Sequence, residues 1–208
     1  MRRALRAWAI RTPLLQRSAP AAQATWRVFT ALRRPTAALH TRAPPDLPHP
    51  KKINSLISRS TSARELLGLH AKYGEAFDSI HLATCWSRLG RVNASDQSWL
   101  RSDDGAPLIA LREQTRDRVH EFGAHAVSTT AHAVAKLDLR GAAWGGLWKE
   151  IEGVALARRR ELNPQGLANT AWAFATAGRA TPALINAIAE ESAGRVHEFK
   201  PQELANTA

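Results

Sequence analysis

The sequence repeats itself at its C-terminal end. Residues 163–171 read NPQGLANTA, and residues 200–208 read KPQELANTA. The two stretches are identical at seven of nine positions and lie 37 residues apart. Identity of this kind at such a spacing is typical of proteins built from stacked supersecondary units. The repeat therefore predicts an array of units in place of a single closed core.

Fainter copies of the same unit precede these two. A VHEF tetrapeptide occurs at 119–122 and again at 196–199, and the segment after the first VHEF matches the repeat at an offset of 40 residues. The most divergent copy covers 77–89 and places Trp86 opposite Trp172. Units of about 37–46 residues thus extend over most of the chain.

Each unit is predicted to be a pair of helices. Asn163 is a good N-cap, Pro164 suits the first helical turn, and Gly178 suits the C-terminal stop. Thr181 and Pro182 repeat the start signal for a second helix. Both helices carry apolar stripes at helical spacing, formed by Leu167, Ala171, Phe174 and Ala175 in the first and by Leu184, Ile185, Ile188 and Ala189 in the second.

Earlier segments carry the same signals. Ser62 and Glu65 form a capping box for a helix over 63–73, and Asp78 caps a helix over 79–89. Polar residues and glycine predict a loop before Pro107. Further helices are expected from Pro107 to about Phe122, over 125–138 and over 144–160. The expected division is a leader with a proline-rich linker (1–50), a divergent first repeat (51–92), a loop (93–106) and helical repeats (107–208).

The predicted fold class is therefore all-α, an α-solenoid of helical hairpins preceded by a disordered basic leader. Ala208 falls in the middle of a predicted helix, which would leave apolar surface uncovered. We accordingly expect the last repeat to be truncated and the chain to be part of a longer protein.

Positive charge is concentrated in the leader. The chain has a net charge of +11, of which residues 1–52 supply +10 and the remaining residues only +1. Arginines scattered among apolar residues, with no acid before Asp46, are typical of organelle import signals. We expect the mitochondrial matrix as the destination, with the plastid stroma as the alternative; a basic arm that binds RNA or acidic partners is the other interpretation. The sequence contains no run of about 20 apolar residues, the length that a membrane-spanning helix needs, so no membrane span is predicted.

The repeats at 163–178 and 200–208 resemble the octotricopeptide repeat of algal and protist organelle proteins. They are also similar to the leucine-rich segment of the FAST-kinase-like family. Residues 53–92, with Ile80 to Leu89 reading IHLATCWSRL, resemble the opening unit of such proteins, so that the resemblance covers roughly 53–208 and is weakest over 91–160. It implies a helical-repeat protein that binds organelle RNA and acts in its maturation, stability or translation. No segment resembles the RAP domain with which many members end, so no activity of that domain is implied.

Candidate RNA-contacting residues follow from the repeat. Each unit of a helical-repeat array can present side chains to successive bases of single-stranded RNA, and amides can pair with base edges. The candidates are Gln165 and Asn169, their equivalents Gln202 and Asn206, and the cationic run Arg158, Arg159 and Arg160. The amides could instead bond neighbouring helices, and the arginines could form a solvated face or stabilise a helix C-terminus.

Signals for other chemistry are weak. His81 and Cys85 share a helix face but lack the third group that a catalytic nucleophile or a metal site needs. We therefore expect both to be buried residues with a structural role. His120, His125 and His132 have no metal-ligand spacing, and His132 occupies the place of Trp172, interpreted as a packing position. Tryptophans at repeat positions favour core anchors over base stacking. We predict no catalytic residues, no metal and no cofactor.

The sequence thus predicts an organelle protein that binds single-stranded RNA and supports post-transcriptional gene expression without catalysis. The alternative is a scaffold for other proteins on the same architecture, because solenoids bind peptides and domains as well. A basic groove beside the four amides would favour RNA, and an apolar or acidic groove would favour the scaffold.

Overall fold

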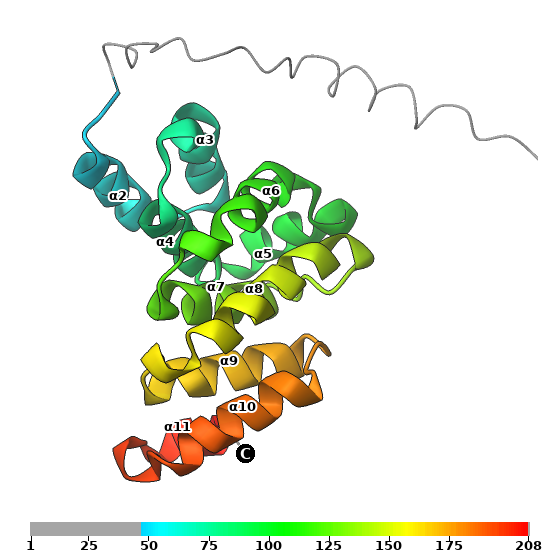
Figure 1. Ribbon diagram of the computed structural model, residues 1–208. Helices are drawn as coiled ribbons and strands as arrows, with labels where there is room; N and C mark the ends of the chain where they lie inside the picture. The colour runs from blue at the N-terminus through cyan, green and yellow to red at the C-terminus, as the bar shows by residue number, and fades with distance from the viewer. Residues whose placement is uncertain (1–46, 208) are drawn as a thin grey trace, which may run out of the picture. The chain divides into compact units, whose positions relative to one another are not determined.

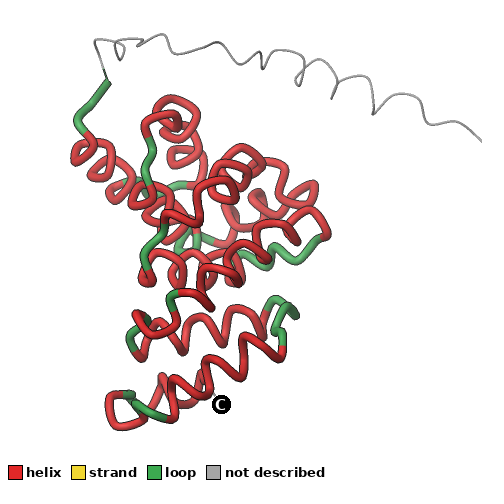
Figure 2. The backbone as a smooth tube through the Cα atoms, viewed as in Figure 1, coloured by secondary structure: helices red, strands yellow, loops and turns green. Residues whose placement is uncertain are grey.

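A computed structural model describes residues 47–207, apart from the side chain of Asp104. This part of the chain is helical throughout and contains no strand (Figures 1 and 2). The predicted leader falls outside the described residues except for 47–50, and the first helix begins at Pro50, the last residue of the predicted linker. The α-helices are α2 (Pro50–Arg59), α3 (Ala63–Tyr73), α4 (Ser79–Leu89), α5 (Ala94–Arg101), α6 (Ile109–Arg118), α7 (Ala124–Lys136), α8 (Gly145–Ala157), α9 (Pro164–Thr176), α10 (Pro182–Ala193) and α11 (Pro201–Thr207).

The predicted helix starts are confirmed by their caps. The Asp78 carboxylate accepts from the backbone N–H groups of Ile80 and His81, each at 2.9 Å. The Asn163 side chain accepts from Gly166 N at 2.7 Å, and the Thr181 hydroxyl accepts from Leu184 N at 3.2 Å. These side chains satisfy N–H groups that have no partner within the helix, which fixes where each helix begins.

The predicted loop over 93–106 is wrong. This segment forms α5 and a 3₁₀ stretch over Ser102–Leu108. Its polar residues act as caps: the Asn93 side chain accepts from Asp96 N at 2.8 Å, and the Asp96 carboxylate accepts from Ala63 N at 2.9 Å. Leu100 is fully buried and anchors the helix to the core. The expected helix from Pro107 begins as α6 only at Ile109, because Pro107 lies in the 3₁₀ stretch.

The helices form two rows. Row A consists of α2, α4, α7, α9 and α11, each packed on the next, and row B contains α3, α6, α8 and α10, of which α6 packs on α8 and α8 on α10. In Figure 1, α6, α8 and α10 lie in front of α7, α9 and α11. Contacts between successive row-A helices are more extensive than those between successive row-B helices.

The same connection recurs from row B back to row A. Four row-B helices are each followed by a three-residue 3₁₀ turn and then by a buried residue with an extended backbone. These buried residues are Phe77, Phe122, Leu162 and Phe199. The VHEF repeat seen in the sequence is therefore this connection, in which the aromatic ring anchors the turn before the next row-A helix begins.

Arginines join neighbouring units at two of these connections. Arg195 pairs with Glu198 of its own turn at 2.9 Å and donates to the Leu162 carbonyl of the preceding connection at 2.8 Å. Arg118 likewise pairs with Glu121 and donates to the Phe77 carbonyl. Each guanidinium thus satisfies a carbonyl of one unit while it is neutralised within the next.

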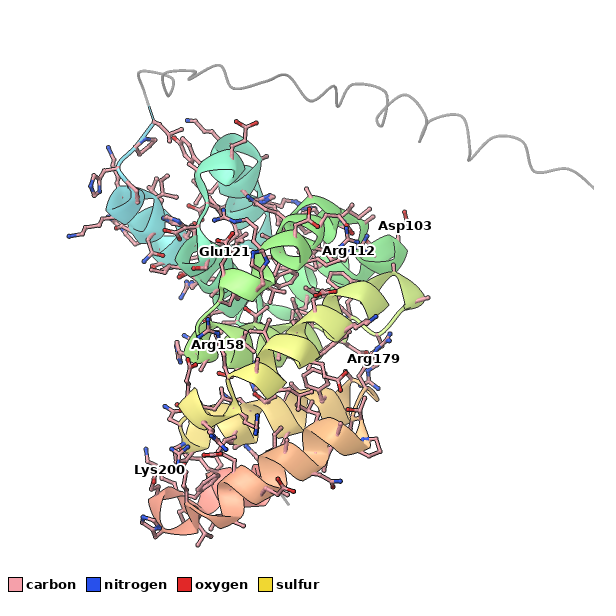
Figure 3. All side chains as sticks on the ribbon, in the orientation of Figure 1. Asp103, Arg112, Glu121, Arg158, Arg179 and Lys200 are labelled. Atoms are coloured by element: carbon pink, nitrogen blue, oxygen red, sulfur yellow. The ribbon has the colours of Figure 1, made fainter. Side chains whose placement is uncertain are left out.

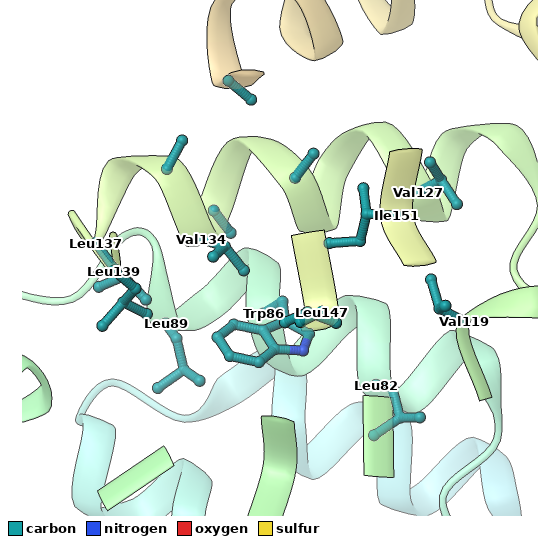
Figure 4. Close-up of a cluster of buried hydrophobic side chains, with 14 of the residues drawn as sticks. Leu82, Trp86, Leu89, Val119, Val127, Val134, Leu137, Leu139, Leu147 and Ile151 are labelled. Carbon is teal, nitrogen blue, oxygen red and sulfur yellow. The ribbon is translucent and has the colours of Figure 1, made fainter. Parts of the chain in front are cut away.

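A continuous apolar core runs between the rows (Figure 4). Trp86 of α4 is completely buried, and its ring meets Trp144 edge-on at a centroid distance of 6.1 Å. Trp148 of α8 meets Phe174 of α9 in the same way at 4.9 Å. Large rings at such contacts account for much of the apolar area that folding removes from water.

Candidate functional site

One face of row A remains uncovered. In α4, α7 and α9 the residues at positions i, i+4, i+7 and i+11, counted from the second residue of each helix, all keep solvent exposure; the last of these after α4, Arg91, lies in the turn that follows the helix. A stripe of this spacing lies along one side of a helix. We call this surface the row-A face; it consists of Ile80, Thr84, Ser87 and Arg91, of His125, Thr129, His132 and Lys136, of Gln165, Asn169, Trp172 and Thr176, and of Gln202 and Asn206 on α11.

An aromatic pair lies in the middle of this face. The rings of His132 on α7 and Trp172 on α9 contact each other in a tilted arrangement, with a centroid distance of 4.8 Å and 39° between their planes. Both side chains are only partly buried. The pair thus bridges two adjacent row-A helices, and both side chains keep part of their area open to solvent.

Two cations adjoin the aromatic pair. Burial lowers the pKa of His132 below its usual value of 6.5, and the positive charges of Lys136 and Arg91 lower it further. Arg91 and Lys136 are exposed, and neither pairs with a carboxylate among residues 47–207. His132 is therefore held in its neutral form next to two unneutralised positive charges.

Charge is divided unequally between the rows. The row-A helices α2, α4, α7 and α9 contain five Lys or Arg residues and no Asp or Glu. The last row-A helix, α11, adds one glutamate, whereas the row-B helices α3, α6, α8 and α10 together contain six Lys or Arg residues and seven Asp or Glu residues. The folded part of the chain is nearly neutral as a whole, but this segregation leaves the row-A helices basic.

The four predicted amides lie on the row-A face. Gln165 and Asn169 are on α9, Gln202 and Asn206 take the equivalent places on α11, and the two helices pack against each other. Gln165, Gln202 and Asn206 are exposed and Asn169 is partly exposed. None of the four side chains is hydrogen-bonded to another residue within 47–207, so they are not used to join neighbouring helices.

The three predicted arginines lie elsewhere. They are in and next to the 3₁₀ turn Arg159–Glu161, before α9 begins, and not on the stripe of exposed residues. Arg158 pairs with Glu161 at 2.9 Å, the equivalent of the Arg118 and Arg195 pairs, and Arg159 donates to the Leu156 carbonyl at 3.0 Å. Arg160 alone is exposed with no partner in the described part of the chain. Figure 3 shows Arg158 and Lys200 at the same edge of the array, opposite Arg179.

The alignment of tryptophans in the sequence needs one correction. Measured from the N-caps Asp78 and Asn163, Trp86 is equivalent to Ala171, and Ser87 is equivalent to Trp172. Trp86, Trp144 and Trp148 are buried, as the core interpretation predicted, whereas Trp172 and His132 keep exposed area. The sequence did contain a signal for this exposure. His132 and Trp172 lie seven residues after His125 and Gln165, and this spacing places them on the same side of their helices as the amides.

His81 and Cys85 are buried structural residues, as the spacing argument favoured. The His81 ring accepts from Asp78 N at 3.1 Å, which completes the cap of α4, and its other nitrogen lies 2.9 Å from the Pro50 carbonyl. Burial raises the pKa of the Cys85 thiol to about 12. A thiol with this pKa is not a nucleophile at neutral pH.

Over residues 47–207 no group of three or more His, Cys, Asp or Glu side chains is placed to hold a metal ion. No helix in the same range combines the length and the apolar character of a membrane span. No protein-family model and no curated protein matches this chain. The case for a function accordingly depends on the row-A face itself.

Proposed function

We propose that the chain is an α-solenoid that binds single-stranded RNA on its row-A face and supports RNA processing, stability or translation in an organelle, without catalysis of its own. The observation that carries the proposal is the absence of acidic residues from α2, α4, α7 and α9, together with the partly exposed aromatic pair on α7 and α9. Stacking of row-A helices with closer contacts than those of row B supports the solenoid, because such an array curves around its more tightly packed row.

The chemistry of the face supports RNA as the partner. Partly exposed aromatic rings stack on bases of any identity, and each stacked base contributes about 1–3 kcal/mol of binding free energy. Arg91 and Lys136 beside the rings can neutralise phosphates, and the free amides can pair with base edges. Four row-A helices contain no acidic side chain, which supports RNA as the partner. An acidic or apolar groove would instead favour the protein scaffold.

The leader supports the organelle part of the proposal by its composition alone. Its arginines and lack of acids fit import into the mitochondrial matrix, with the plastid stroma as the alternative.

The proposal is tested by removing the two cations of the face. In the full chain, Arg91→Ala combined with Lys136→Ala is expected to weaken binding to a fluorescent single-stranded RNA. The slope of log K against log salt concentration should become shallower by about 1.4, because each phosphate contact to a single strand contributes about 0.7. Fluorescence anisotropy at several salt concentrations measures both changes.

The matched control is Arg101→Ala combined with Lys72→Ala, which removes the same charges from exposed positions outside row A. This variant should bind like the wild type, because it carries the same leader and the same row-A face. Equal RNA binding by the wild type and both double variants would show that Arg91 and Lys136 do not contribute to RNA binding, and would contradict the proposal.

RNA affinity is expected to rise a few-fold as the pH falls below 6.5. The pKa of His132 in the free protein lies below 6.5, so the ring is neutral at pH 7. A bound polyanion favours the protonated ring, so the complex takes up a proton and affinity increases as the pH falls towards the pKa of the free protein. Anisotropy between pH 5 and pH 8 measures the increase, and His132→Gln should reduce it; an unchanged pH profile in that variant would exclude His132 from the interface.

A further inference from the structure

A cavity of about 360 Å³ lies between the rows, away from the stripe of exposed row-A residues. It is bounded by the beginning of α8, the end of α9 and the beginning of α10. Its lining includes Gly145, Trp148, Lys149, Glu152, Arg179 and Thr181. A cavity of this size falls within the range of small-molecule binding sites.

Arg179 is held firmly at this cavity. One of its terminal nitrogens, Nη2, donates to the carbonyls of Arg140 and Gly141 at 3.0 and 3.2 Å, which ties the loop after α9 to the loop after α7. The other, Nη1, lies over Gly145, where an added Cβ would be 3.4 Å away. Because carbonyls fix the guanidinium without neutralising it, its remaining N–H groups are oriented in advance for an anion.

The cavity carries an excess of positive charge. Neither Arg179 nor Lys149 pairs with a carboxylate in the described part of the chain, unlike Arg118, Arg158 and Arg195 at the connections between units. The single acidic residue of the lining, Glu152, accepts a hydrogen bond from the Thr181 hydroxyl, which in turn caps α10. Two unpaired cations therefore face one engaged carboxylate.

The floor of the cavity is apolar. Trp148 and Phe174 line it, and their rings pack edge-on against each other at 4.9 Å. Charged donors next to aromatic side chains suit a ligand that joins an oxyanion to a less polar group.

We propose that this cavity binds a phosphate group, with Arg179 as a forked donor and Lys149 as the second cation. A forked guanidinium matches two phosphate oxygens, and an ammonium group can neutralise a third. The phosphate could belong to a free nucleotide or to an RNA end. The site is independent of the proposed function, because none of its lining residues belongs to the row-A face.

Isothermal titration calorimetry of the full chain with adenosine monophosphate, and with a short RNA bearing either a 5′-phosphate or a 5′-hydroxyl, tests the site. We expect Lys149→Ala and Arg179→Gln each to weaken binding of the phosphate-bearing probe by about tenfold, the size of one lost charge-assisted hydrogen bond. Lys200→Ala, an exposed lysine outside the cavity, is the control and should have no effect. Lys149 is exposed, so its substitution leaves the fold intact even if that of Arg179 does not.

The probes separate the two sources of phosphate. Binding of the mononucleotide that is lost in both cavity variants supports a free nucleotide. Tighter binding of the 5′-phosphorylated RNA than of the 5′-hydroxyl RNA, with the difference reduced in the same variants and no binding of the mononucleotide, supports an RNA end. The proposal is overturned if the mononucleotide does not bind at millimolar concentration and the 5′-phosphorylated RNA binds no more tightly than the 5′-hydroxyl RNA, or if the contribution of the phosphate persists unchanged in Lys149→Ala and Arg179→Gln. The Arg91 and Lys136 double variant should bind the mononucleotide normally, which distinguishes failure of this site from failure of the row-A face.

Discussion

Trp172→Ala is expected to weaken binding of single-stranded RNA by about 5- to 150-fold, which corresponds to the 1–3 kcal/mol of one base stacked on an aromatic ring. Trp172 lies on the row-A face, and its ring rests on His132 with part of its area open to solvent. Removing it takes away the one tryptophan ring of the row-A face while the charges of Arg91 and Lys136 remain. The salt dependence of binding should therefore stay unchanged.

Two further variants make this prediction specific. Trp172→Phe keeps an aromatic ring and should retain most of the affinity. Trp99→Ala removes another partly exposed tryptophan, which lies on α5 under the Arg64 guanidinium and outside row A, and should leave RNA binding unchanged. If Trp172→Ala binds RNA as tightly as the wild type, the aromatic pair does not contact bases. A circular dichroism melt shows whether each variant is folded.

Trp86→Ala is expected to lower the free energy of unfolding by about 3–5 kcal/mol, the usual cost of truncating a large buried ring. Trp86 is completely buried between α4 and its neighbours and contacts Trp144 edge-on. Its Nε1 donates to the Thr115 hydroxyl at 2.8 Å, and that hydroxyl donates to the Leu111 carbonyl at 2.7 Å. The substitution removes both the packing of a core ring and the link from row A to α6.

Denaturant unfolding monitored by circular dichroism measures this loss. Ile80→Ala on the same helix is the control: its side chain is 62% exposed, so its truncation should change the free energy of unfolding by less than about 0.5 kcal/mol. Thr115→Val separates the hydrogen bond from the packing, because it leaves the Trp86 N–H without its acceptor at a cost of about 1–3 kcal/mol. A loss below about 1 kcal/mol for Trp86→Ala would contradict the placement of this ring at the centre of the core.

Local signals predicted most of the helices. Asp78, Asn163 and Thr181 cap the helices that follow them, since a side-chain oxygen and the N–H group that it accepts from are only a few residues apart. The same reasoning failed at 93–106 because Asn and Asp serve equally in loops and at helix starts. The segment forms a helix because this buries Leu100, and the residues that cover Leu100 are distant in the sequence.

The candidate site was predicted only in part. Gln165 and Asn169 were found because the repeat copies them as Gln202 and Asn206, whereas the pairing of Arg158 with Glu161 was not predicted, because it forms only in the folded turn. Arg91, Lys136 and the His132–Trp172 pair were missed. They come from α7, from α9 and from the turn after α4, and no local pattern brings them together.

The sequence by itself specified a chain made of short helices. Its signals were the periodic apolar residues, the helix caps and the internal repeat, and the interactions that they reflect act within one or two helical turns. The tertiary structure decided which tryptophans are covered and which remain open. Trp86 and Trp172 are both aromatic residues late in a row-A helix, yet they differ by one position in register, about 100° around the helix axis. That rotation buries one ring and leaves the other at the surface, because only neighbouring helices determine which side of a helix is covered.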